Sequence, residues 1–241
     1  MKVRGLLVAL ALALPFGAPA SAGAPNGLIV WPSRVRIPAG ATAVVHVQNR
    51  GRHTAAFAIG VAGLGLDLLG RPRVIGGHSL VSVRPPRLVV APGHTATLAV
   101  HARRVSGPGD HPALVLLTAN SAGGAGIGVR LRIGVAVEVR VSGVVRRSLV
   151  LGALTVHRGV LDVVVRNRGN VEERIGRGDL VGQVWVRGRL AAVVAPQPQT
   201  LLPRGRGVIR FGLPHRLHGR ARITVAAPRL PLRARSYVVA I

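Results

Sequence analysis

The sequence predicts an all-β protein of two tandem immunoglobulin-like β-sandwich domains after a cleaved signal peptide. Three observations predict this fold: runs of strictly alternating apolar and polar residues, Gly and Pro between these runs, and a set of landmarks that occurs twice in the same order. Strict alternation has the period of a half-buried strand and does not suit a helix. Short strands between turn residues are typical of β-sandwiches.

The predicted signal peptide spans residues 1–22. Lys2 and Arg4 precede the apolar run LLVALALAL, and Ala20-Ser21-Ala22 is a small-residue cleavage site. This run is too short for a membrane-spanning helix, and no later stretch approaches the roughly 20 apolar residues that a span needs. We therefore expect a secreted, extracellular protein associated with the cell envelope, without a transmembrane span in its mature chain.

The predicted first domain spans residues 23–143. Its clearest strand is VRLRIGVAVEVRV at 129–141, where apolar side chains alternate with an outward set that consists of Arg130, Arg132, Glu138 and Arg140. An earlier strand has Ala43, Val45 and Val47 on its inward side. Both patterns predict one face on a core and one face in solvent.

The predicted second domain spans residues 144–241. One strand has Leu161, Val163 and Val165 on its inward side, and a later strand has Ala221, Ile223 and Val225. Gly and Pro lie between these runs, as they do in the first half. The same alternation therefore predicts a second sandwich.

The two halves share an ordered set of landmarks. VQNRG at 47–51 corresponds to VRNRG at 165–169, and a Pro before a strand follows in each half. The two Asn are 118 positions apart, and Pro92 and Pro203 are 111 apart. We interpret this as two copies of one domain, in which Asn bonds to its own turn and Gly supplies a positive φ. The expected turn residues are Asn49, Gly51, Asp110 (in GPGDHP), Asn167 and Gly169.

The composition excludes several classes of protein. The chain has no Cys, and its seven acidic residues show no spacing that brings two carboxyl groups together for acid–base catalysis. Glu172 and Glu173 predict a solvated polar loop, and the HxxH pair at 215–218 lacks further ligands. We therefore expect a protein that is not an enzyme and has no catalytic residues, cofactor or metal.

The net charge of +26 is the strongest signal for a binding function. Such a field attracts any polyanion, but aromatic residues make up only 2% of the chain, so nucleic acid is expected to bind only non-specifically. The expected partner is peptidoglycan, an anionic cell-wall polymer or another surface protein. Outward arginines would bind it, because guanidinium groups can form paired hydrogen bonds with phosphate and carboxylate. The candidates are Arg130, Arg132, Arg140, Arg166, Arg220 and Arg222. A solvated face in an arginine-rich chain is the alternative interpretation.

The first half resembles the N-terminal domain of the WxL-interacting protein family. The shared features are a strand that ends in V-x-N-x-G, a Pro-Gly before a strand, the GDH turn, and a long alternating strand that ends at VRVSG. The resemblance covers residues 23–143 and implies a peptidoglycan-binding domain, followed by one that contacts a partner. The chain ends at RSYVVAI, without the membrane helix that is usual in that family.

The architecture also resembles that of pilus assembly chaperones, which have two immunoglobulin-like domains. A long alternating strand ends the first domain in both, so VRLRIGVAVEVRV is the candidate for pairing with a subunit by strand addition. The resemblance implies a basic anchor for the terminal carboxylate of the subunit, for which Arg130 or Arg132 is the candidate. The alternative function is therefore that of a periplasmic or extracellular chaperone.

Overall fold

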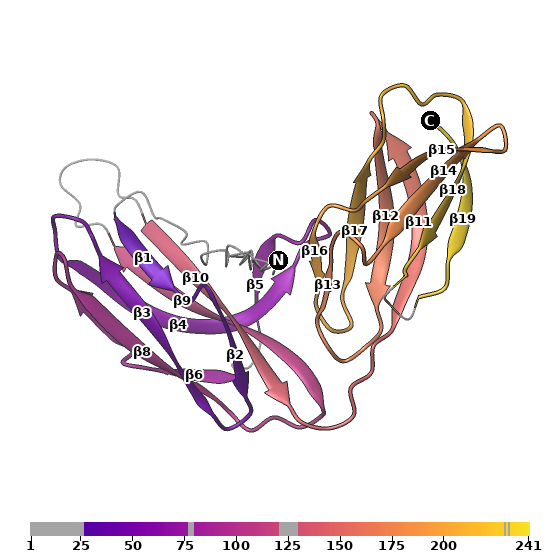
Figure 1. Cartoon of the computed structure of the whole chain (residues 1–241). Coiled ribbons are helices and arrows are strands. Elements are labelled where there is room, and N and C mark those ends of the chain that lie inside the picture. Colours follow the sequence, from indigo (N-terminus) through magenta and orange to yellow (C-terminus); the bar gives the residue numbers. More distant parts are fainter. Residues whose placement is uncertain (1–26, 77–79, 121–129, 229, 231) are drawn as a thin grey trace, which may run out of the picture.

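The computed structural model describes residues 27–76, 80–120, 130–228, 230 and 232–241. The predicted signal peptide at 1–22 lies outside these residues. All regular elements in the described ranges are strands, which confirms the all-β prediction. The chain folds into two lobes that form the arms of a V, and it passes from one lobe to the other at the base of the V (Figure 1). Within the described ranges, the structure contains no helix long and apolar enough to cross a membrane.

Within the described residues, the first lobe contains ten strands. They are β1 (Leu28–Trp31), β2 (Arg34–Pro38), β3 (Thr42–Asn49), β4 (Ala55–Leu66), β5 (Pro72–Ile75), β6 (Val81–Arg84), β7 (Arg87–Val90), β8 (Thr95–Ala102), β9 (Gly109–Asn120) and β10 (Arg130–Val141). One sheet has the order β1-β3-β8-β6, and the other has the order β2-β10-β9-β4-β5, with β7 also paired to β4. All pairs are antiparallel except β2 with β10, which is parallel.

The described part of the second lobe contains nine strands. They are β11 (Leu149–His157), β12 (Val160–Asn167), β13 (Glu173–Ile175), β14 (Val181–Val186), β15 (Arg189–Val194), β16 (Gln199–Leu201), β17 (Arg206–Gly212), β18 (Arg220–Ala226) and β19 (Arg235–Ala240). They form the sheets β11-β12-β17, β13-β16 and β15-β14-β18-β19. The domain boundary predicted at residue 143 lies between β10 and β11, and it stays a prediction.

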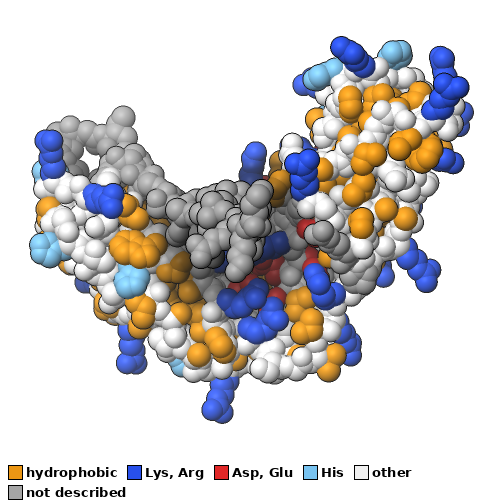
Figure 2. All heavy atoms as spheres, viewed as in Figure 1, with side chains coloured by type: hydrophobic (Ala, Val, Ile, Leu, Met, Phe, Trp, Pro, Cys, Tyr) orange, Lys and Arg blue, Asp and Glu red, His pale blue; other side chains and the backbone are white. Residues whose placement is uncertain are grey.

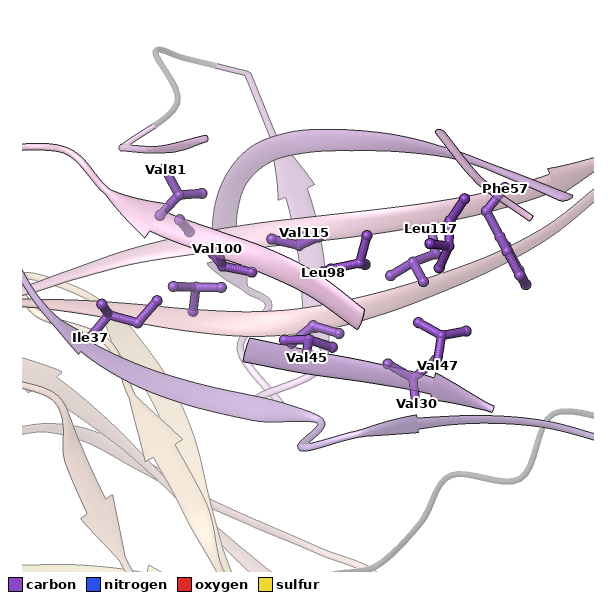
Figure 3. Close-up of a cluster of buried hydrophobic side chains, with 14 of the residues drawn as sticks. Val30, Ile37, Val45, Val47, Phe57, Val81, Leu98, Val100, Val115 and Leu117 are labelled. Atoms are coloured by element: carbon purple, nitrogen blue, oxygen red, sulfur yellow. The ribbon is translucent and has the colours of Figure 1, made fainter. Parts of the chain in front are cut away.

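Each lobe has its own apolar core, built from the inward residues that the alternation predicts. Val45 and Val47 are fully buried in the first core, while Val44, which precedes Val45 and faces the other way, is 48% exposed. Figure 3 shows Val45, Leu98 and Val115 meeting in one cluster. In the second core, Val163 and Ile223 are fully buried. Burial of this apolar surface is the main stabilising contribution in each sandwich.

The repeated Asn residues occupy equivalent places in the two lobes. The side-chain oxygen of Asn49 accepts a hydrogen bond from the Gly51 N–H at 2.9 Å, and that of Asn167 accepts one from Gly169 at 2.8 Å. Their backbone N–H groups donate to the equivalent residues His94 and Gly205. The repeat is therefore one turn architecture used twice.

The expectation for the two glycines was wrong. Neither Gly51 nor Gly169 has a positive φ. At Gly169 the reason for glycine is space, because a Cβ atom there would lie 2.3 Å from the carbonyl oxygen of Arg146. The turn itself is closed by the Asn side chain and not by left-handed backbone.

Candidate functional site at the open edge of β10 and the domain junction

Only part of the β10 strand is paired on both sides. Its whole length, Arg130–Val141, pairs with β9, but β2 covers only Ala136–Arg140. Within the described part of the chain, no strand pairs with the other side of β10 before Ala136. An unpaired strand edge is a template for another chain.

The edge is open because the chain changes sheets between β1 and β2. β1 pairs with β3 in one sheet, and β2 pairs with β10 in the other. Pro32 and Ser33 join the two strands, and Pro32 has no N–H for a ladder. β2 begins only at Arg34 and therefore leaves the first half of β10 without a neighbour on this side among the described strands.

The even-numbered residues of β10 direct their backbone groups to this edge. The Ala136 N–H donates to Ser33 O at 3.0 Å, and the Arg140 C=O accepts from Ala39 N–H at 2.9 Å. Because backbone groups alternate sides along a strand, the N–H and C=O groups of Arg132 and Gly134 point to the open side. These groups can hydrogen-bond to an added strand.

A cavity of about 350 Å³ adjoins the open edge. Gly134 and Ala136 line it from β10, and Arg34 lies at its wall. Its apolar lining is Leu64, Leu66 and Leu114 from the first lobe and Leu202 from the second. An added strand with alternate apolar side chains could place them in this cavity.

The lobes meet at a cluster of buried carboxylates. Four of the seven acidic residues lie here, each with a side chain at most 4% exposed: Asp110, Glu138, Glu172 and Glu173. Figure 2 shows acidic and basic side chains together where the lobes meet. Because buried carboxylates are stable only with partners, these residues fix the arginines around them.

The Glu172 carboxylate joins the two lobes. It accepts hydrogen bonds from Arg34 of the first lobe and, at 3.1 Å, from Arg174. The Glu172 backbone N–H donates to the Asp110 carboxylate at 2.7 Å, and Arg140 forms an ion pair with Asp110. The predicted solvated loop at Glu172 and Glu173 was wrong, because the sequence did not show that Arg34 of the first lobe would pair with Glu172 or that Arg147 would pair with Glu173.

Asp110 differs from its predicted place in a turn. It is the second residue of β9, and the turn precedes it at Gly107 and Gly109, both of which have positive φ. The Asp110 N–H donates to the backbone oxygen of Asn170 at 2.8 Å. Asp110 is thus a contact between the lobes.

The Glu138 carboxyl is buried, although the alternation predicts an outward position. It pairs with Arg36 of β2 at 2.7 Å and with Arg140 at 3.5 Å. Burial raises the pKa of Glu138, and neighbouring Asp110 raises it further, while Arg36 acts in the opposite direction. The outer face of β10 is buried here because the second lobe and β2 lie over it.

A second contact joins the lobes at the tip of the β4–β5 hairpin. The Val208 N–H of β17 donates to Leu68 O at 2.7 Å. The Asp67 carboxylate closes the tip by accepting from the N–H groups of Leu69 and Arg71, and these bonds lower its pKa. Figure 1 shows this hairpin reaching toward β16.

The structure does not bring the six predicted binding arginines to one face. Arg130 begins β10, but its side chain lies outside the described residues, and Arg132 is exposed on the open half of the strand. Arg140 is ion-paired in the junction. Arg166 lies on β12, while the exposed Arg220 and Arg222 lie on β18 in another sheet of the second lobe. Their role in binding stays a prediction.

Sequence reasoning missed the residues that surround the open edge. Arg34 and Arg36 alternate in a strand of only five residues, which is too short for a clear periodic signal. Leu202 and Leu66 come from different lobes, so only the tertiary structure places them together. In the described part of the chain, no group of three or more His, Asp or Glu residues could hold a metal ion.

The comparisons with known proteins give structural neighbours only. No family model and no curated protein matches this chain. The chain is similar to the class 5 fimbriae chaperone CfaA, with a TM-score of 0.50 and 10% identity over 88% of this chain and 98% of that one. It is also similar to the YadV chaperone, with a TM-score of 0.51 and 10% identity over 89% of this chain and 100% of that one.

A third similar structure is a chain of the CsuC–CsuE chaperone–tip adhesion subunit pre-assembly complex from Acinetobacter baumannii, with a TM-score of 0.51 and 12% identity over 89% of this chain and 97% of that one. At these identities the likeness shows the fold, which confirms two immunoglobulin-like sandwiches. The resemblance to the WxL-interacting protein family finds no support, and neither does peptidoglycan binding. The non-enzymatic interpretation agrees with these neighbours, which are chaperones by name.

Proposed function

We propose that this protein is a chaperone-like protein that holds another exported protein by strand addition along residues 130–135 of β10. The observation that carries the proposal is the unpaired side of β10 before Ala136, beside a cavity lined by Leu64, Leu66 and Leu202. The fold shared with solved chaperones supports it. The predicted signal peptide supports a site of action outside the cytoplasm.

The chemistry of recognition follows from the edge. Backbone hydrogen bonds from Arg132 and Gly134 would give affinity for any extended chain. The alternation of side chains along the partner strand would decide which partners bind. Partner residues on one face would lie beside the half-buried Leu131 and Ile133, and partner residues on the other face would lie in the cavity. The preferred segment is therefore an extended strand with apolar residues at alternate positions.

The direct test replaces Arg132 by proline. Arg132→Pro removes an edge N–H without removing a bond to β9, whereas Arg132→Ser removes the same charge and keeps the N–H. The probe is a synthetic peptide of alternating valine and threonine. We expect the proline variant to bind it about tenfold more weakly than the serine variant, since a lost hydrogen bond and a steric block each weaken pairing.

Hydrogen exchange gives the second measurement. Peptide binding should slow exchange of the Gly134 amide, which the open edge exposes, and should leave the Val135 amide, which faces β9, unchanged. Equal affinity of the proline and serine variants, or no protection at Gly134, would refute strand addition at this edge.

A further inference from the structure

Four arginines surround one depression on the second lobe. Arg166, Arg168, Arg204 and Arg206 line a cavity of about 590 Å³, and all four are exposed. None of them forms an ion pair with any carboxylate in the described part of the chain. The site is separate from the open edge of β10, which these residues do not line.

The arrangement brings like charges together. Arg166 on β12 and Arg206 on β17 are direct cross-strand partners. Like charges in this relation repel each other, so the pair destabilises the ladder unless an anion lies between them.

The first lobe shows that the fold does not need these arginines. Because Asn49 corresponds to Asn167, Gln48 and Thr95 occupy the places of Arg166 and Arg206, and they too are cross-strand partners. The same ladder therefore forms with neutral residues in one lobe and with two arginines in the other.

The turn beside the four arginines also has an equivalent in the first lobe that carries no arginine. Ala91–His94 and the segment 202–205 are equivalent turns, each closed by a backbone hydrogen bond of 3.0–3.1 Å. Gly93 has φ 75° in the first, and Arg204 has φ 58° in the second. A residue other than glycine is strained in the left-handed conformation. Arg204 therefore adds a positive charge to the site and lowers the stability of the turn.

An apolar cavity of about 650 Å³ adjoins the cluster, and the two share Gly205 and Arg206. It lies between the β4–β5 hairpin and the second lobe, and its apolar lining includes Leu64, Leu66, Leu68, Leu69, Ile75 and Leu202. Leu68 is 43% exposed and Ile75 is 48% exposed. Asp67 also lines this cavity, but its carboxylate is occupied by the N–H groups of the hairpin tip.

We propose that this pair of cavities binds an anionic phospholipid, with the phosphate on the four arginines and an acyl chain among the leucines. Guanidinium groups bind phosphate through paired hydrogen bonds, and four unpaired ones supply the matching charge. The adjoining leucines supply the apolar surface that an acyl chain needs and a free phosphate does not. The protein thus docks on the surface of an anionic membrane through arginines that do not line the strand-binding edge, while Leu64, Leu66 and Leu202 line both apolar cavities.

The test uses the residues of the first lobe as replacements. The triple variant Arg166→Gln, Arg204→Gly, Arg206→Thr installs the residues that the equivalent turn and ladder already tolerate, so it should fold. The control Arg189→Thr, Arg216→Gln, Arg233→Gln removes the same charge from exposed arginines elsewhere on this lobe. Binding of the mature protein to phosphatidylglycerol vesicles is measured by sedimentation, with phosphatidylcholine vesicles as the neutral reference.

We expect the triple variant to bind phosphatidylglycerol vesicles about 100-fold more weakly, since each of the three arginines near an anionic surface contributes about fivefold. The control variant should lose less than about threefold. Equal losses in the two variants would show that net charge alone drives binding, and would overturn the site.

A second variant distinguishes a site for a lipid from a site for a free anion. Leu68→Ser should weaken vesicle binding about tenfold by removing apolar contact with the acyl chain, and Val238→Ser, at a position 60% exposed on β19, should not. Inorganic phosphate should compete only weakly with the vesicles. Vesicle binding that is unchanged in Leu68→Ser and displaced by inorganic phosphate would reduce the site to a simple anion site and overturn the lipid proposal.

Discussion

At the scale of single residues, Asn167 is a polar side chain that stabilises a turn from a buried position. It is fully buried, and its amide donates to the backbone oxygens of Val171, Leu201 and Leu202 at 2.7–3.3 Å. Asn49 donates in the same way to His53 and Val90. Each side chain thus replaces backbone pairing at a place where the chain leaves a strand.

We predict that Asn167→Ala lowers the free energy of unfolding by about 3 kcal/mol, because it leaves several buried backbone oxygens without donors. Asn49→Ala should have a similar effect on the first lobe. Urea unfolding measures both, and Gln48→Ala is the control, with an expected change within about 0.5 kcal/mol. A loss below about 1 kcal/mol for Asn167→Ala would show that water satisfies these oxygens.

At the scale of elements, the two halves of β10 differ. Its first half has an open edge, and its second half carries Glu138 and Arg140 into the junction. Arg36 is the cross-strand partner of Glu138, so the short β2 strand both closes half of the edge and neutralises the buried acid. The position of β2 therefore fixes which part of this edge of β10 is open.

The buried Glu138 at the junction of the lobes predicts that the stability of the protein depends on pH. Burial raises the pKa of Glu138 in the folded protein above its unfolded value, so the folded state binds this proton more tightly. The contribution of Glu138 to stability is therefore complete below the unfolded pKa and is lost as pH rises through the folded pKa. Glu138→Gln cannot titrate and lacks this loss.

We expect the difference in unfolding free energy, wild type minus Glu138→Gln, to fall as pH rises from about 4 and then to level off. Urea unfolding at several pH values measures it. A difference that rises with pH would mean that the ion pair with Arg36 dominates and that the folded pKa is lowered.

At the scale of the whole molecule, the relative position of the lobes depends on close backbone contact. A Cβ atom on Gly109 would lie 2.0 Å from the backbone oxygen of Asn170 in the second lobe. The Asn170 amide also donates to Pro108 O of the first lobe and to Val144 O of the connecting segment. Glycine at this position is therefore a condition for the V shape seen in Figure 1.

We predict that Gly109→Ala forces the lobes apart and increases the radius of gyration in small-angle X-ray scattering. Gly107→Ala is a matched control, because Gly107 also has a positive φ but nothing lies within 4 Å of its Cβ position. Both variants strain the same turn, and only one meets the second lobe. Identical scattering curves for the two variants would show that the junction absorbs the extra atom.

The sequence by itself determined the strands, their inward faces and the repeat of two sandwiches. Those features depend on the local alternation of side chains, as at Val163 and Ile223, and on turn residues such as Asn49 and Asn167. The long alternating strand and the resemblance to pilus chaperones also predicted β10 as the candidate strand for pairing, but not which half of it is open.

Only the tertiary structure decided which residues come together at the two candidate sites and at the junction of the lobes. The open edge exists because β2 begins at Arg34, and Glu138 is buried because another lobe and another strand cover an outward position. The four arginines meet because β12 and the turn before β17 are neighbours in space. Local periodicity shows which face a residue takes on its own strand. Contacts between distant segments decide what then lies against that face.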